Sequence, residues 1–217
     1  MLRERVTVTL QPELIQAVDL LVDRQTLRNR SHAFEHLLKE GLGLHELQHA
    51  FLFFAEGWTQ AQLEAVLTLC ADIGVRTLLL CLPTAQVADA LAILANHPSA
   101  AQVTSQTVPP DFGSGGALLL QRVSLTHPFL LFWLGPELAL PSNLIQPYTF
   151  HRQHHAVLTR VIHSADGHTY RASGVDIAQP ELLDAIPAGI VSLEAVVFPQ
   201  LIRDARIRGY ATATTTF

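Results

Sequence analysis

Apolar and polar residues alternate strictly over residues 5–10, at the start of the chain. The polar positions are Arg5, Thr7 and Thr9, and the aliphatic positions are Val6, Val8 and Leu10. A period of two, carried by valine and threonine, predicts a β-strand with one aliphatic face and one polar face.

The spacing of apolar residues then changes to that of helices. Pro12 suits the first turn of a helix, because the N–H that it lacks would have no intrahelical partner there. The apolar stripe of this helix is Leu14, Ile15, Val18, Leu21 and Val22. After a turn at residues 25–28, Asn29 fits the N-cap of a second helix that ends near Gly41. The apolar side of the second helix is Ala33, Phe34, Leu37 and Leu38.

From Ala50 onward, apolar runs alternate with stretches of helical period. Strands are predicted over residues 51–55, 75–81 and 129–134, and helices over 61–73, 85–95 and 117–123. The strands are apolar along their whole length, which is typical of a sheet that helices cover on both faces. The pattern predicts an α/β domain with a mostly parallel sheet over residues 50–217, preceded by a separate domain over residues 1–44.

Charge is distributed unevenly between these two predicted domains. Within residues 1–44, six basic residues balance six acidic ones, so the remainder carries the whole formal net charge of −5. An acidic second domain argues against a broad nucleic-acid surface there. Any DNA contact is therefore expected near the N-terminus.

The composition and the apolar runs also indicate the cellular compartment of the protein. The longest apolar runs are far shorter than the ~20 residues that span a bilayer, and charged residues at positions 3–5 interrupt any signal peptide. Cys70 and Cys81 lie in apolar contexts without CxxC spacing, as buried thiols of a reducing compartment do. The sequence predicts a cytoplasmic, nucleoid-associated protein without membrane contact.

A strand and two helices within residues 1–44 cannot bury their apolar faces in a monomer. The segment, through RVTVTL at 5–10 and NRSHAFEHLLKEGL at 29–42, resembles the ribbon-helix-helix DNA-binding family of the CopG, Arc and MetJ repressors. The resemblance implies a homodimer whose paired strands enter the major groove of double-stranded DNA. It assigns base contacts to Arg5, Thr7 and Thr9, and phosphate contacts to Arg28, Asn29, Arg30 and Ser31. Two alternatives are an ordinary strand at a sheet edge and a ribbon that serves only to dimerise.

The second domain resembles another family. FGSGGALLLQ at 112–121, and GVDIAQPELLDAIP and SLEAVVFPQLIRDARIRGY within 174–210, are similar to segments of the sugar-1-phosphate nucleotidyltransferases. PFLLF at 128–132 and FHRQHHAVLT at 150–159 fit that family's central strand and next helix. The resemblance implies a Rossmann-like fold and a loop that approaches a nucleotide or sugar-phosphate ligand, at Gly113, Ser114, Gly115 and Gly116. Alternatively, these glycines only turn the chain into a helix.

The sequence departs from this family wherever its catalytic residues would lie. AEGWTQ at 55–60 stands in place of a long Gly-rich basic loop, and Lys39 is the only lysine of the chain. The family's first metal-binding aspartate falls near residues 135–136, with Glu137 as a displaced carboxylate, and the second falls beyond Phe217. Without these groups the charge of a transferring phosphoryl group has no stabiliser. We therefore expect an inactive relative with no catalytic residue, no metal and no cofactor.

Two histidine patterns are weaker candidates for metal sites. Residues 45–49 read HExxH, which on a helix binds zinc through two histidines. The strand predicted from Phe51 leaves that helix no room. His151, His154 and His155 fit one helix face, where exposed polar side chains are the more common arrangement.

Together these features predict a dimeric, sequence-specific transcriptional regulator. Its inactive nucleotidyltransferase-like domain would sense a ligand or mediate assembly. Two alternatives stay open: an active sugar nucleotidyltransferase with a dimerising N-terminal segment, and a plasmid-maintenance or antitoxin-type protein whose second domain binds another protein.

Overall fold

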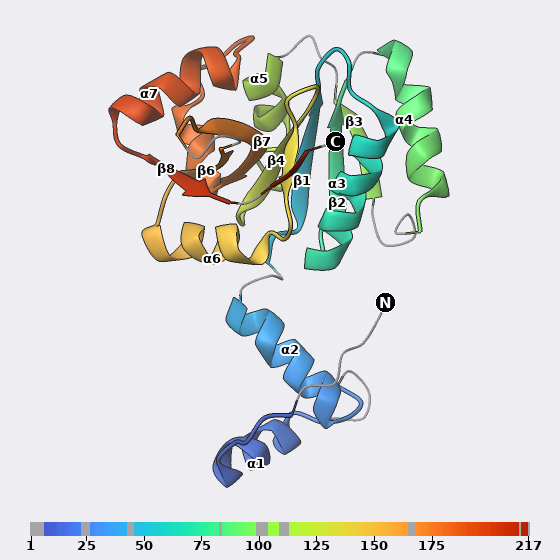
Figure 1. The fold of residues 1–217 in the computed structure, drawn as a ribbon, viewed down its shortest axis with the longest axis vertical. Coiled ribbons are helices and arrows are strands. Elements are labelled where there is room, and N and C mark those ends of the chain that lie inside the picture. The colour runs from blue at the N-terminus through green and yellow to red at the C-terminus, as the bar shows by residue number, and fades with distance from the viewer. Residues whose placement is uncertain are drawn as a thin grey trace. The chain divides into compact units, whose positions relative to one another are not determined.

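The computed structural model describes residues 7–22, 27–42, 46–82, 84–98, 104–108, 113–164, 168–212 and 214–216. Contacts divide the chain into two compact units, Met1–Gly43 and Leu44–Phe217. Figure 1 shows two helices in the first unit and a helix-covered sheet in the second. Within the described ranges, no helix has the length and apolarity needed to cross a membrane.

The first unit consists of α1 (Pro12–Leu20) and α2 (Arg30–Leu42). Both helices begin as the sequence predicts: Pro12 opens α1, and the Asn29 Oδ1 accepts a hydrogen bond of 3.0 Å from the His32 N–H at the start of α2. The Arg30 guanidinium donates to both carboxylate oxygens of Asp19, at 2.7 and 2.6 Å. This bidentate pair joins the end of α1 to the beginning of α2.

The strand predicted over residues 5–10 is not formed in the described part of that segment. Residues 7–10 belong to no helix or strand, and residues 5 and 6 lie outside the described residues. A strand requires a partner for its backbone hydrogen bonds. The ribbon that the resemblance implies takes its second strand from another copy of the chain.

The second unit is built on a seven-stranded sheet. Its order is β3 (Thr104–Val108), β2 (Thr77–Cys81), β1 (His49–Phe54), β4 (Phe129–Leu134), β7 (Arg171–Ala178), β6 (Leu158–His163) and β8 (Ile207–Ala211). Strand β7 is antiparallel to both of its neighbours, and the other neighbouring pairs are parallel. A mixed α/β fold with a mostly parallel sheet is thus confirmed. A small second sheet pairs β5 (Ala139–Pro141) with β9 (Thr214–Thr216).

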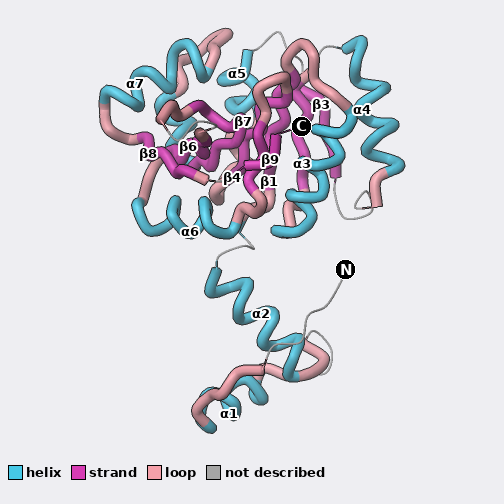
Figure 2. The backbone as a smooth tube through the Cα atoms, viewed as in Figure 1, coloured by secondary structure: helices cyan, strands magenta, loops and turns pink. Residues whose placement is uncertain are grey.

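Helices cover both faces of the large sheet, as the fully apolar strands predict (Figure 2). They are α3 (Gln60–Ile73), α4 (Thr84–Asn96), α5 (Gly113–Leu120), α6 (Ile145–His154), the 3-10 helix η4 (Pro180–Ala185), the π-helical turn η5 (Leu193–Val197) and α7 (Phe198–Arg203). Local sequence explains the limits of α3. Thr59 and Gln62 form a capping box at its start, and Gly74 ends it with a φ of 86°, which glycine adopts without strain.

Each strand contributes alternate residues to two separate apolar cores. Leu52, Leu80 and Phe132 pack on the side of α3, α4 and α6. Their neighbours Phe51, Leu79 and Leu131 pack on the side of α5, η4, η5 and α7. At about 1.5–3 kcal/mol for each fully buried large aliphatic or aromatic side chain, these two cores supply most of the driving force for folding.

The limits of α5 differ from the prediction, and both cysteines are buried as predicted. The helix predicted over residues 117–123 begins earlier, at Gly113, and residues 121–124 form turns. Both cysteines are free and buried, as the apolar contexts predict. Burial raises the pKa of the Cys81 thiol to about 12 and also raises that of Cys70, so neither is a reactive thiolate near neutral pH.

Candidate functional site

The carboxyl ends of β1 and β4 lie where the strand order reverses: β2 neighbours β1 on one side and β4 neighbours it on the other. In open α/β sheets, ligands bind in the crevice outside the carboxyl ends of the strands at such a point. A crevice of about 390 Å³ opens there. Small-molecule sites typically measure ~300–1,000 Å³, so this crevice, the β1–β4 crevice, is the candidate site of the second unit.

Aromatic rings form one wall of the β1–β4 crevice. Phe53 of β1 and Trp133 of β4 occupy the same register position on adjacent strands, and their rings stack with centroids 4.5 Å apart. Phe198 at the start of α7 meets the Trp133 ring edge-on at 6.2 Å. Offset and edge-on contacts are the arrangements that aromatic quadrupoles favour. The wall is therefore held rigidly by the sheet.

A charged pair lies beside this wall. Asp176 of β7 is 1% exposed, and its carboxylate accepts from the Arg160 Nε at 2.8 Å and from an Arg160 terminal nitrogen at 3.0 Å. The Trp133 Nε1 donates a third hydrogen bond to Asp176, at 2.9 Å. Burial opposes the charge of Arg160, but its hydrogen bonds to Asp176 and the charges of Asp176 and Glu194 raise its pKa. Arg160 therefore keeps its positive charge near neutral pH.

Sequence reasoning missed the pair of Arg160 and Asp176. The available signal was Asp176 itself, the one charged residue among residues 173–178, which fit a predicted buried segment of the resembling family. A carboxylate in a buried strand needs a partner, because an isolated buried charge is costly. Which arginine supplies that partner depends on the register of β6 with β7, where Arg160 lies opposite Asp176.

At the place where the family resemblance puts a long Gly-rich basic loop, the chain runs from β1 to α3 in a short connection that contacts the end of β4 and the residues after it. The Ala55 N–H donates to the Leu134 carbonyl at 2.8 Å, and the Gln62 side-chain amide donates to the Gly135 carbonyl at 2.7 Å. A Cβ at Gly57 would lie 3.4 Å from the Pro136 side chain. Residues 55–59 thus form a tight connection to α3.

Glu137 is exposed and lines the crevice. It is the carboxylate nearest in sequence to the position of the family's first metal-binding aspartate. Among the described residues, no group of three or more His, Cys, Asp or Glu side chains is arranged to hold a metal ion.

The four residues predicted as a ligand loop, Gly113 to Gly116, open helix α5 and pack against the segment before η5. The Gly115 N–H donates to the Val191 carbonyl at 2.8 Å, and the Ser114 hydroxyl accepts from the Leu193 N–H at 2.8 Å. A Cβ at Gly113, whose φ is 65°, would lie 2.7 Å from the Val191 oxygen. These contacts alone require glycine at Gly113, whether or not a ligand approaches.

In the first unit, the predicted DNA-contact residues that are described are exposed. Thr7 and Thr9 precede α1, and Arg28, Asn29 and Ser31 lie at the beginning of α2. Arg5 lies outside the described residues. The Arg30 side chain is held by Asp19.

The described residues of the HExxH pattern, 46–49, do not form an α-helix. His45 lies outside the described residues, the Glu46 carboxylate accepts a 2.5 Å hydrogen bond from the Tyr148 hydroxyl, and His49 begins strand β1.

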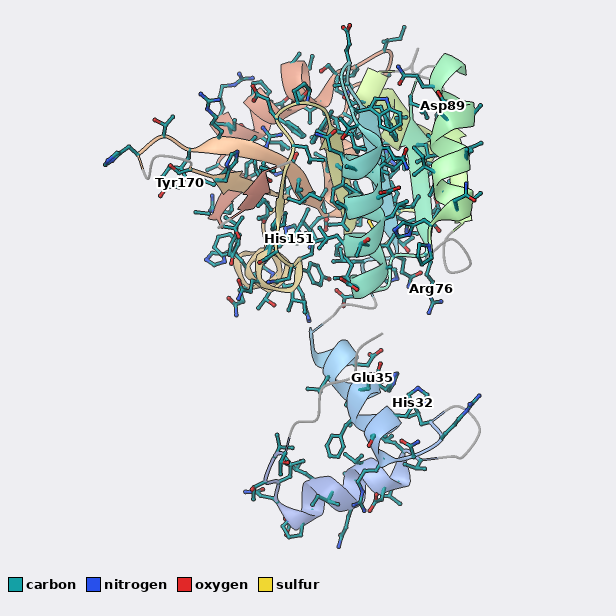
Figure 3. The ribbon with its side chains drawn as sticks, turned by 45° about the vertical axis from the view of Figure 1, so that its right-hand side comes forward. His32, Glu35, Arg76, Asp89, His151 and Tyr170 are labelled. Carbon is teal, nitrogen blue, oxygen red and sulfur yellow. The ribbon has the colours of Figure 1, made fainter. Side chains whose placement is uncertain are left out.

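The two histidines of α6 lie in different surroundings. His151 (labelled in Figure 3) is buried between Thr159 and Gln179, each 2.9 Å from a ring nitrogen, whereas the exposed His154 stacks on Phe150.

His151 should make stability depend on pH. Its burial lowers its pKa to about 4, whereas an unfolded histidine has a pKa near ~6.5. The unfolded chain therefore binds the proton first, so the stabilisation present above pH ~6.5 is lost as the pH falls towards ~4, by up to ~3 kcal/mol. Urea denaturation between these limits should show a shallower pH dependence for His151→Gln than for the wild type. The exposed His155→Asn variant should keep the wild-type slope; equal slopes in all three proteins would contradict the assignment.

Comparison with known proteins adds information on the fold. No protein-family model and no curated protein sequence matches the chain. Among solved structures, it is similar to HddC from Yersinia pseudotuberculosis, with 12% identity, a TM-score of 0.56 and coverage of 77% of this chain and 91% of that one. The same protein complexed with GMP-PN matches with 13% identity, the same TM-score and the same coverage.

A putative glucose-1-phosphate thymidylyltransferase from Bacillus anthracis, solved in complex with a sucrose, is also similar. It matches with 11% identity and a TM-score of 0.55, over 78% of this chain and 88% of that one. Identities this low show a shared fold alone. The α/β unit of this chain therefore has a nucleotidyltransferase-like fold.

Proposed function

We propose that this chain is a dimeric, sequence-specific DNA-binding regulator that reads DNA through paired N-terminal strands. The observation that carries the proposal is an apolar groove of about 410 Å³ on the first unit. Its lining residues come from both helices and from the segment before them: Leu10, Leu14, Ala17, Val18, Leu21, Phe34, Leu37 and Leu38.

A second copy of the same unit is the occupant that fits this groove. Leu14 is 52% exposed and Leu38 is 64% exposed, and residues 1–43 are close to the limit of ~40 residues below which domains usually need an oligomer or another staple. Val8 is 65% exposed and alternates with the polar residues of the predicted strand. An antiparallel pair of these strands would cover the grooves of both copies and satisfy the strand hydrogen bonds together.

The paired strands would direct Arg5, Thr7 and Thr9 away from the apolar side. Arginine donates to guanine in a bidentate manner, and threonine bonds to bases or packs against the thymine methyl group. The amino end of α2, capped by Asn29, offers N–H groups and the positive end of its dipole to a phosphate. The neutral charge balance of this segment then implies modest non-specific affinity, with specificity resting on the groove contacts.

A variant in the groove tests dimerisation. Leu38→Glu places a charge where the second copy would pack, and should convert a dimer into a monomer of 23.8 kDa in sedimentation equilibrium. Leu20→Glu is the matched control, because Leu20 is 88% exposed and does not line the groove. A wild-type protein that is monomeric at micromolar concentration, or a Leu38→Glu protein that dimerises as well as the control, would refute the dimer.

Selection of bound fragments from a random DNA pool, followed by sequencing, tests the function itself. A ribbon dimer predicts a short, two-fold symmetric motif, with affinity that falls as salt rises. Recovery of no enriched motif would exclude sequence-specific recognition.

An active sugar nucleotidyltransferase is the second candidate, favoured by the fold that the chain shares with the putative thymidylyltransferase. Against it stand the short connection at residues 55–59 and the absence of lysine from the α/β unit. Release of pyrophosphate from a nucleoside triphosphate, a sugar 1-phosphate and Mg²⁺ distinguishes the two. We expect none above background, and robust turnover would overturn the proposal that this unit is inactive.

A further inference from the structure

The β1–β4 crevice carries an excess of negative charge. Among the described residues that line it, the ionisable side chains are Glu137, Arg160, Asp176 and Glu194. Arg160 and Asp176 neutralise each other through two hydrogen bonds. The two glutamates, both exposed, remain as unbalanced charges at the rim.

The charge of Arg160 is already offset by Asp176. Two of its guanidinium nitrogens bond to Asp176, and its central carbon lies 4.6 Å from the centroid of the Phe198 ring. The negative charge of Glu194 also raises the pKa of Arg160. A phosphate entering the crevice would therefore meet two carboxylates and one arginine whose charge Asp176 already offsets, which is unfavourable in a partly desolvated site.

The aromatic wall suits the opposite charge. Trp133 is half-buried and lines the crevice together with Phe53 and Phe54. Its orientation is fixed on one side by the stacked Phe53 ring and at its indole N–H by Asp176. Tryptophan is the aromatic side chain that attracts cations most strongly, and carboxylates beside such rings strengthen the attraction.

We propose that the β1–β4 crevice binds a small organic cation, with an ammonium group held between the aromatic wall and the carboxylates of Glu137 and Glu194. The ligand class follows from the charge of the lining residues, and it differs from the nucleotides and sugar phosphates that the sequence resemblance implies. The inference is independent of DNA binding, because each residue that carries it belongs to the α/β unit.

Choline and its uncharged isostere 3,3-dimethyl-1-butanol form a matched pair of probes for the full-length protein. Isothermal titration calorimetry should give saturable binding of choline, with a dissociation constant of about 1 mM or below. The uncharged isostere should bind at least ~10-fold more weakly, because it lacks the attraction to the rings and the carboxylates. Glucose 1-phosphate should give no binding.

Charge-neutral variants locate the site. Glu194→Gln and Glu137→Gln should each weaken choline binding several-fold, and the double variant should abolish it. Glu181→Gln is the control, because Glu181 is an exposed carboxylate of η4 that does not line the crevice. Trp133 fluorescence in a Trp58→Phe background gives a second readout, and calorimetry on the wild type suffices if that variant does not fold.

Equal binding of choline and its uncharged isostere would overturn the proposal. So would binding of glucose 1-phosphate more tightly than choline, choline binding that survives the double variant, or no binding of choline at all.

Discussion

Replacing Arg5, Thr7 and Thr9 together by alanine is expected to reduce affinity for the selected DNA motif by at least ~100-fold, equivalent to about 2.7 kcal/mol. In a dimer the change removes six side chains from the reading face, and a good bidentate base contact contributes about 1–3 kcal/mol of discrimination. Thr7 and Thr9 are exposed, so the variant should keep its helices and its dimeric state. Titration of labelled DNA measures the affinity, and sedimentation checks the dimer.

A control separates base reading from general charge. Arg203→Ala removes one exposed arginine from the α/β unit and should leave the affinity for the motif within ~2-fold of the wild type. The triple variant should also lose most of its preference for the motif over random DNA, because the remaining contacts reach only phosphates. If the triple variant binds the motif as tightly as the wild type, the ribbon does not read DNA.

Arg160→Ala is expected to lower the free energy of unfolding of the α/β unit by ~3–5 kcal/mol. The change leaves the carboxylate of Asp176, which is 1% exposed, with the Trp133 N–H in place of three donors. A buried charge that has lost its counterion is far more costly than an intact pair. Both tryptophans of the chain lie in this unit, so urea denaturation followed by tryptophan fluorescence reports its stability directly.

The chain offers a matched control in a second arginine–aspartate pair. Arg122 and Asp184 are 2.6 Å apart, with side chains 56% and 67% exposed, and Arg122→Ala should cost less than ~1 kcal/mol because water screens the pair. The double variant Arg160→Met/Asp176→Leu should recover much of the loss, since it leaves no unpaired charge. Equal effects of Arg160→Ala and Arg122→Ala would show that burial does not determine the strength of the pair.

Periodicity alone located most of the elements between Pro12 and Leu134, and it predicted none after Leu134. The helical spacing after Pro12, the N-cap at Asn29 and the apolar runs of β1, β2 and β4 correspond to elements of the structure within a few residues. These features depend on interactions between neighbours in sequence, or on burial that every residue of a strand shares. The nucleotidyltransferase-like fold was accessible from segments that resemble that family, and the solved structures support it at the level of the fold.

The candidate site required the tertiary structure. Arg160 meets Asp176 because β6 and β7 pair in one particular register, and Phe53 meets Trp133 because β1 and β4 do. Helix α5 begins at Gly113 and not at the predicted residue 117. The glycines that open it are positioned by contact with Val191, far along the chain. Periodicity carries no information on such long-range pairs.

What the sequence determined by itself is therefore the type of most elements between Pro12 and Leu134, their apolar faces and the excess of acidic residues in the α/β unit. The tertiary structure decided which charges neutralise each other, which rings stack and which residues line the crevice between β1 and β4. The reason is physical: burial and local hydrogen bonding act on every residue according to its own type and its neighbours, whereas the chemistry of a site depends on strand registers that only the whole fold sets.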